Sequence, residues 1–220
     1  MPKGAQAKRL NGQDMVSIRQ EQATDEDGIR RVNEAAFGRP DEAALVDALR
    51  GSEAVICSLV AAEAGVVIGH ILFSVATLTS HSQSASPTHS QPGSQSPGQS
   101  AGRLDDLAAS GPQSQAANPL LSRPLAALGP VAVAPTHQRQ GIGGQLITAG
   151  LELCRAAGYD LVIVLGHREY YPRFGFRPAA PLDIRWEHGA EAHFMVLELQ
   201  PGALAGASGV VRYRPEFDGV

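Results

Sequence analysis

The chain has 220 residues, of which 43% are hydrophobic, and it carries a formal net charge of −4 and two cysteines. This length and apolar content favour one domain with a sizeable core, and the acidic balance argues against a nucleic-acid binder. No apolar run approaches the roughly 18 residues needed to cross a bilayer and the start lacks an apolar signal core, so a cytoplasmic protein without a membrane partner is expected.

The first part of the chain predicts a strand followed by two helices. Residues 1–14 are polar and predict a disordered lead-in, and residues 16–19 predict a short strand. Thr24 with Asp27 three residues later is an N-cap pattern for a helix that ends at Gly38, with an inward face of Ile29, Val32, Ala36 and Phe37. Pro40 favours the start of a second helix that ends at Gly51, with an inward face of Leu45, Val46 and Leu49.

A hairpin and then a segment of different composition follow. Residues 54–61 and 66–78 are branched and apolar, which predicts an antiparallel hairpin. Residues 79–118 contain no Val, Ile, Phe, Met, Trp or Tyr and predict a disordered insertion, because they offer too little apolar surface to offset the ordering of their backbone. Leu104 and Leu107 could form one helical turn or a docking spot there, with an ordinary linker as the simpler interpretation.

The most informative stretch is residues 131–144, where an apolar strand turns through a glycine-containing loop directly into a helix. Residues 125–134 predict the strand, and Pro135 ends it because proline cannot continue the ladder. A helix that stops at Gly158 is indicated by the spacing of Leu146, Ile147, Gly150, Leu151, Leu153, Cys154 and Ala157. Its first turn directs unpaired N–H groups and the positive dipole end at the loop, which predicts a phosphate site.

The glycine spacing excludes two common phosphate motifs. A P-loop needs Gly-x-x-x-x-Gly-Lys followed by Ser or Thr, and no lysine lies near this loop. A dinucleotide fingerprint needs Gly-x-Gly-x-x-Gly, but counting on from Gly141 and Gly143 places Leu146 at the third glycine. The remaining pattern resembles the pyrophosphate loop of the GNAT acyltransferase superfamily: Gln138-Arg139-Gln140-Gly141-Ile142-Gly143.

A second element carries the same resemblance. Residues 160–165 predict another buried strand, and Tyr171 lies four residues before Gly175 of a Gly-Phe pair. A tyrosine at this distance in GNAT enzymes protonates the departing coenzyme A, which implies that role for Tyr171. Tyr170 is the alternative, because the intervening segment is shorter here than in the family. The stretch Gly-His-Arg-Glu-Tyr-Tyr-Pro-Arg-Phe-Gly-Phe-Arg-Pro is similar to small bacterial members predicted to be N-acetyltransferases.

The order of expected elements matches the GNAT order over about residues 16–200. Residues 182–186 and 193–199 predict a final strand pair, and residues 210–214 could add a short strand. The resemblance implies an α/β (α+β) architecture, the GNAT acyl-CoA N-acyltransferase fold, with a mixed, mostly antiparallel sheet flanked by helices. The expected organisation is a lead-in over 1–14, a GNAT domain over 15–200 interrupted by the 79–118 insertion, and a C-terminal tail over 201–220.

The resemblance implies an enzyme that transfers an acetyl group from acetyl-CoA, its co-substrate, to a primary amine by direct attack on the thioester. The acceptor would be a small-molecule or peptide amine, and no metal is implied. Backbone groups of Val131, Ala132 and Val133 would pair with the pantetheine arm, and the Val133 N–H would polarise the thioester carbonyl. The pyrophosphate would bind the loop amides, with added charge from Arg139: Gln138, Arg139, Gln140, Gly141, Ile142, Gly143 and Gly144.

The chemistry suits a tyrosine and also requires a base. The conjugate acid of the leaving thiolate has a pKa near ~8.5, whereas a tyrosine with a pKa near ~10 stays protonated at neutral pH and can donate. The amine arrives protonated, so a base must accept its proton directly or through water. Glu34, His70 and His167 are candidates for that base.

Two other functions stay open from the residues alone. A non-catalytic acyl-CoA sensor or scaffold would keep the loop without turnover, and a nucleotide-binding protein would use the loop for another phosphate ligand. Cys57 and Cys154 are predicted to be small core residues, because neither has a local histidine-bearing motif that would indicate a catalytic thiol. The seven histidines show no metal-ligand spacing.

Overall fold

The computed structural model of the protein describes residues 16–80 and 124–219. The expected lead-in over 1–14 and nearly all of the 79–118 insertion, with Leu104 and Leu107, lie outside the described residues. Within the described ranges, no helix is both long enough and apolar enough to span a membrane.

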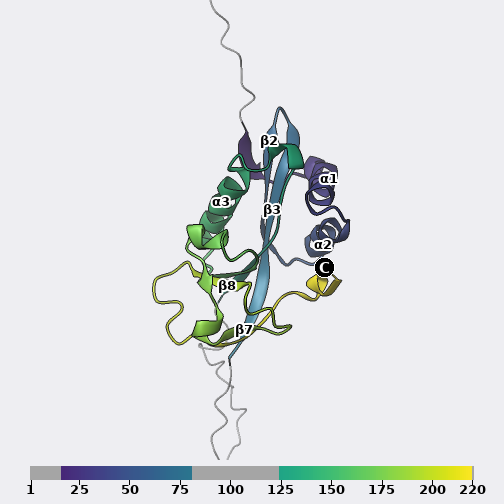
Figure 1. Cartoon of the computed structure of the whole chain (residues 1–220). Coiled ribbons are helices and arrows are strands. Elements are labelled where there is room, and N and C mark those ends of the chain that lie inside the picture. The colour runs from purple at the N-terminus through teal and green to yellow at the C-terminus, as the bar shows by residue number, and fades with distance from the viewer. Residues whose placement is uncertain (1–15, 81–123, 220) are drawn as a thin grey trace, which may run out of the picture.

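A nine-stranded sheet forms the centre of the molecule (Figure 1). Its main path runs β1-β2-β3-β4-β5-β8-β6; β9 joins the end of β3, and β7 pairs with β9. Neighbours are antiparallel except β4 with β5 and β7 with β9, which confirms the expected mixed, mostly antiparallel sheet. The strands are β1 (Ser17–Gln20), β2 (Val55–Glu63), β3 (Val66–Thr79), β4 (Leu125–Val133), β5 (Leu161–Leu165), β6 (Arg177–Pro178), β7 (Ile184–Trp186), β8 (Phe194–Glu198) and β9 (Gly209–Arg212).

Helices cover both faces of the sheet. α1 (Glu26–Phe37) and α2 (Asp41–Arg50) lie on one side and α3 (Ile142–Ala156) on the other (Figure 1). α2 buries Leu45, Val46 and Leu49 as predicted, and the predicted hairpin is formed by β2 and β3. Gly38 ends α1 with φ 72°, a left-handed conformation that glycine adopts without a steric cost.

The start and end of α1 correct the sequence-based prediction. Thr24 is not the N-cap: a 3-10 turn (Ala23–Asp25) precedes α1, and the Asp25 carboxylate accepts the Gln22 backbone N–H at 2.8 Å while it pairs with Arg19. A carboxylate is a stronger acceptor here than a threonine hydroxyl. Phe37, expected to face inward, is 41% exposed because it is the last residue of α1.

The C-terminal strands also differ from the prediction. Residues 182–186 and 193–199 do not pair with each other: β8 lies between β5 and β6, whereas β7 pairs with β9. Short apolar runs indicate which side chains are buried but not which strand lies beside them, so pairing could not be read locally. β9 also pairs with the end of β3, so the segment expected to be a tail adds a strand to the domain.

Candidate functional site

β4 and β5 lie side by side over only part of their length. Parallel pairing joins residues 125–127 to residues 161–163, and β4 then continues with β3 alone through residues 131–133. Within the described chain, the other edge of β4 has no strand partner over residues 131–133. An extended ligand can pair there as an added strand.

The loop after β4 opens α3 as the sequence predicts. Gly141 takes φ 85°, which makes the tight turn into the helix. The Gln145 N–H donates to the Gly141 carbonyl at 3.0 Å, so the amides of residues 142–144 precede the first hydrogen-bonded turn. These amides and the positive end of the helix dipole are an arrangement that can bind an anion.

The glutamine side chains of the loop bond to nearby backbone. Gln140 Nε2 donates to the Thr136 carbonyl at 3.2 Å, and Gln138 Nε2 donates to the Val133 carbonyl at 3.1 Å. The Val133 carbonyl is therefore within reach of a donor from the open side of β4. Arg139 is exposed beside the same opening, with φ 62°.

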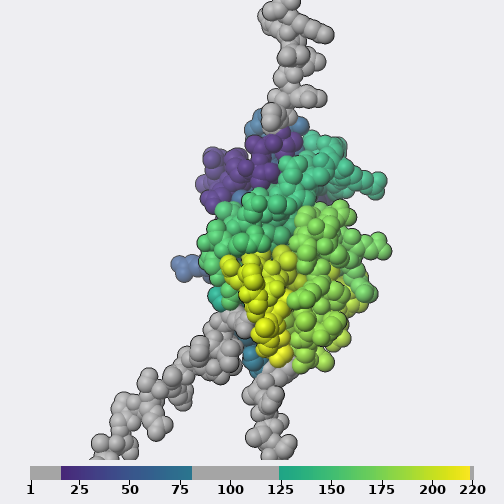
Figure 2. All heavy atoms as spheres, turned by 90° about the vertical axis from the view of Figure 1, so that its left-hand side faces the viewer, coloured from purple at the N-terminus to yellow at the C-terminus, as the bar shows by residue number. Residues whose placement is uncertain are grey.

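Two clefts meet beside this loop. The first, called the loop cleft, has a volume of about 1050 Å³ and runs between the N-terminus of α3 and the segment after β5, which lie together on the face seen in Figure 2. The second, called the aromatic cleft, has a volume of about 460 Å³ and extends from β4 to the C-terminal strands. Both clefts are lined by Phe37, Val131, His167 and Tyr171.

Tyr171 occupies the junction and Tyr170 does not. Tyr171 is 8% exposed, and burial, followed by the neighbouring Tyr170, raises its pKa to about 12, so its phenol stays protonated. A Cβ at Gly166 would lie 2.3 Å from Tyr171 Cε2, so glycine is required there to make room for the ring. The Tyr170 hydroxyl instead lies near Gly143, and its ring stacks under Arg173 at 4.5 Å.

The three candidate bases do not come together. His167 lines both clefts, next to Tyr171. Glu34 is absent from the lining of either cleft in the described chain, and its half-exposed carboxylate lies 3.9 Å from Arg30. His70 is fully buried.

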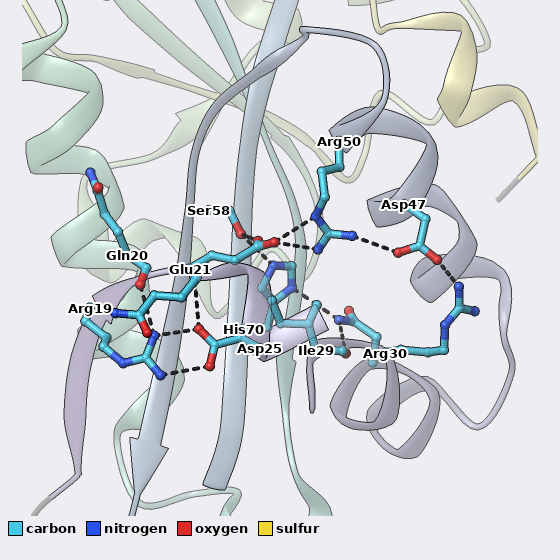
Figure 3. A network of polar contacts seen from close by, with 12 residues as sticks. Arg19, Gln20, Glu21, Asp25, Ile29, Arg30, Asp47, Arg50, Ser58 and His70 are labelled. Atoms are coloured by element: carbon cyan, nitrogen blue, oxygen red, sulfur yellow. Dashed lines mark hydrogen bonds and ion pairs between the residues drawn. The ribbon is translucent and has the colours of Figure 1, made fainter. Parts of the chain in front are cut away.

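His70 belongs to a polar network between the sheet and the first two helices (Figure 3). Asn33 Nδ2 donates to His70 Nδ1 at 3.2 Å, and His70 Nε2 donates to the Ser58 hydroxyl at 3.0 Å, which in turn donates to Glu21. Arg50 pairs with Glu21 at 2.7 Å. Burial, and then the charge of Arg50, lowers the pKa of His70 to about 3. Because both ring nitrogens are engaged, His70 is a structural group.

We expect the buried histidine to make stability depend on pH below neutrality. A histidine in the unfolded chain has a pKa of 6.5 and folded His70 about 3, so unfolding takes up a proton between these values. The contribution of His70 to the free energy of unfolding is therefore fully present above pH 6.5. It falls as the pH is lowered, by about 2 kcal/mol at about pH 5. Urea unfolding at about pH 7.5 and pH 5 measures this loss.

The matched control separates His70 from other acid-sensitive groups. His70→Gln should remove most of the loss between these two pH values, whereas the exposed His167→Gln should keep it. Equal urea midpoints for the wild-type protein at both pH values would show that His70 is not held neutral.

The two cysteines lie in the core. Cys57 and Cys154 are buried in one core cluster, as predicted. Among the described residues, no cluster of His, Cys, Asp and Glu could hold a metal ion.

The sequence analysis did not predict the cleft wall formed by Trp186, Tyr213 and Phe217. The sequence feature that could have indicated this wall is the clustering of aromatic residues near the C-terminal end, because the chain as a whole is only 5% aromatic.

Comparison with known proteins identifies the class to which this fold and site belong. The family model described as "Acetyltransferase (GNAT) family" matches residues 20–176. The chain therefore belongs to the GNAT family of acetyltransferases, and the enzyme class is a GNAT-type N-acetyltransferase. This confirms the family and the fold that the sequence motifs implied.

Individual relatives agree with the family assignment. Escherichia coli (strain K12) YjhQ, named an uncharacterized N-acetyltransferase, is 34% identical over 192 residues, covering 83% of this chain and 85% of YjhQ. The structure of Escherichia coli YhbS in complex with CoA has a TM-score of 0.73 at 27% identity, covering 96% of each chain. A GNAT acetyltransferase from Brucella melitensis in complex with acetyl-CoA has a TM-score of 0.64 at 31% identity, covering 93% of this chain and 99% of that one.

Proposed function

We propose that this protein transfers the acetyl group of acetyl-CoA to a primary amine by direct attack of the amine on the thioester. The observation that carries the proposal is the meeting of two clefts at Tyr171, one beside the loop that opens α3 and the other between β4 and the C-terminal strands. Two clefts with one shared wall allow donor and acceptor to be bound together. Such a pair of sites favours direct transfer, because proximity lowers the barrier.

The donor would occupy the loop cleft. The free edge of β4 over Val131, Ala132 and Val133 suits the amides of pantetheine, and the amides of residues 142–144 suit the pyrophosphate. Gly143 and Gly144 line the cleft without side chains that would hold a phosphate away. The CoA and acetyl-CoA complexes of the two similar structures support this choice of donor.

The acyl transfer is a single displacement at the thioester carbonyl. The amine nitrogen bonds to the carbonyl carbon, the carbon–sulfur bond breaks, and the Val133 N–H stabilises charge on the carbonyl oxygen. The Tyr171 hydroxyl donates its proton to the departing thiolate, and a base takes the proton released by the amine. His167 is the candidate base that lines both clefts.

The test is release of free thiol from acetyl-CoA across a panel of primary amines, with CoA affinity measured in parallel. We expect turnover with at least one amine and saturable CoA binding. Tight CoA binding with no turnover on any amine would instead establish an acyl-CoA sensor. Binding of ATP in place of CoA would establish a nucleotide-binding protein.

A further inference from the structure

The aromatic cleft has a lining that acetyl transfer by itself does not require. Three large hydrophobic side chains are exposed among the described residues, and two of them, Phe37 and Leu165, lie in this cleft. The chain has one Trp, four Tyr and six Phe, and five of these eleven line this cleft: Phe37, Tyr171, Trp186, Tyr213 and Phe217. Exposed apolar side chains gathered in a concave site indicate a ligand with apolar surface.

One wall of the cleft is already assembled. The Trp186 ring meets the Tyr213 ring edge-on, with centroids 6.0 Å apart and planes at 75°, and Tyr213 lies 4.9 Å from Phe217. Pairing of β7 with β9 holds Trp186 beside Val211, and the terminal 3-10 turn (Pro215–Gly219) contacts α2. Because the side chains of this wall are ordered before binding, the entropic cost of binding a ligand is lower.

The charges of the cleft are nearly balanced. Glu42, the one carboxylate in the described lining, is buried, and its Oε1 accepts the Arg39 Nε–H at 3.1 Å. Glu42 Oε2 is buried without a hydrogen-bond partner among the described residues. A polycation would need several carboxylates for its charges, and the described lining offers only Glu42, whose charge is already paired with Arg39.

We propose that the aromatic cleft selects an acceptor with one primary amine joined by a short chain to an aromatic ring. This inference rests on the proposed acetyl transfer. The ring packs against Trp186 and Tyr213, where edge-to-face and offset contacts are favourable. The short linker of the ligand then places its amine beside Tyr171, where the two clefts meet.

Three amines test the acceptor class: phenethylamine, propylamine and spermidine. We expect kcat/KM for phenethylamine to exceed that for propylamine by about 100-fold, because the ring leaves water on binding, and spermidine to be no better than propylamine. Equal rates for phenethylamine and propylamine, or a preference for spermidine, would overturn the acceptor class and leave acetyl transfer standing.

One exposed leucine and one exposed valine give a matched pair of variants, one inside the aromatic cleft and one outside it. Leu165 lines the aromatic cleft, whereas Val66, also exposed, begins β3 outside both clefts. Leu165→Ala should lower the phenethylamine-to-propylamine ratio of kcat/KM about 10-fold, and Val66→Ala should leave it unchanged. An unchanged ratio in Leu165→Ala would place the ring elsewhere.

Binding without turnover can be read separately. Trp186 is the only tryptophan in the chain, so its fluorescence reports occupation of this cleft. Saturable quenching by phenethylamine but not by propylamine, with no acetylated product, would retain the ligand class and reject the proposed enzyme. No fluorescence change with phenethylamine at concentrations that saturate turnover would reject the cleft as the ring site.

Discussion

Replacing Tyr171 with Phe should lower kcat on the order of 100-fold and leave the Kd for CoA within about 3-fold of the wild-type value. Loss of a general acid removes stabilisation that exists only in the transition state, and 100-fold corresponds to about 2.7 kcal/mol. Because burial raises the Tyr171 pKa to about 12, the phenol loses its proton only as pH rises through that value. The wild-type rate should therefore show no loss from this group up to about pH 10.

Two further variants separate the acid from a general disturbance of the site. Tyr170→Phe keeps the ring near Gly143 and should change kcat less than about 3-fold. Gly166→Ala places a methyl group where the Tyr171 ring lies and should lower kcat while Tyr171 is still present. If Tyr171→Phe turns over normally and Tyr170→Phe does not, the acid is Tyr170.

Replacing Gly144 with Asp should weaken CoA binding on the order of 100-fold without lowering thermal stability. A Cβ at Gly144 would lie 3.6 Å from Phe174, an ordinary contact, so a side chain can begin there without a clash. A carboxylate in the first turn of α3 is favourable for the helix dipole but repels a pyrophosphate bound at the same amides. The measurements are the Kd for CoA and the Tm of the ligand-free protein.

Gly144→Asn is the matched control, since it has nearly the same size and no charge. We expect it to weaken CoA binding by only a few fold, so the difference between Asp and Asn isolates the electrostatic contribution. That difference should shrink as salt is added, because counterions screen the repulsion. Equal affinities for Asp and Asn would show that the phosphates lie away from the helix terminus.

The elements that could be predicted are those whose signal is local. The strand, loop and helix around Gly141 were predictable because a tight turn, a proline stop and helical spacing all lie within one continuous stretch. The pairing of β7 with β9 was not predictable, since its partner lies beyond β8 in sequence and short strands carry no register code. Asp25, and not Thr24, lies at the start of the helix, where its carboxylate pairs with Arg19 of β1, a contact that the N-cap pattern does not include.

The same division holds at the site. The sequence by itself determined the family, the glycine loop that opens a helix, and the presence of a tyrosine before Gly175, because motif spacing records these features directly. Only the tertiary structure decided which tyrosine stands where the two clefts meet, that His70 is sealed in a polar network, and that aromatic rings from distant segments line one cleft. Burial and convergence depend on packing between elements far apart in the chain, and no local pattern encodes them.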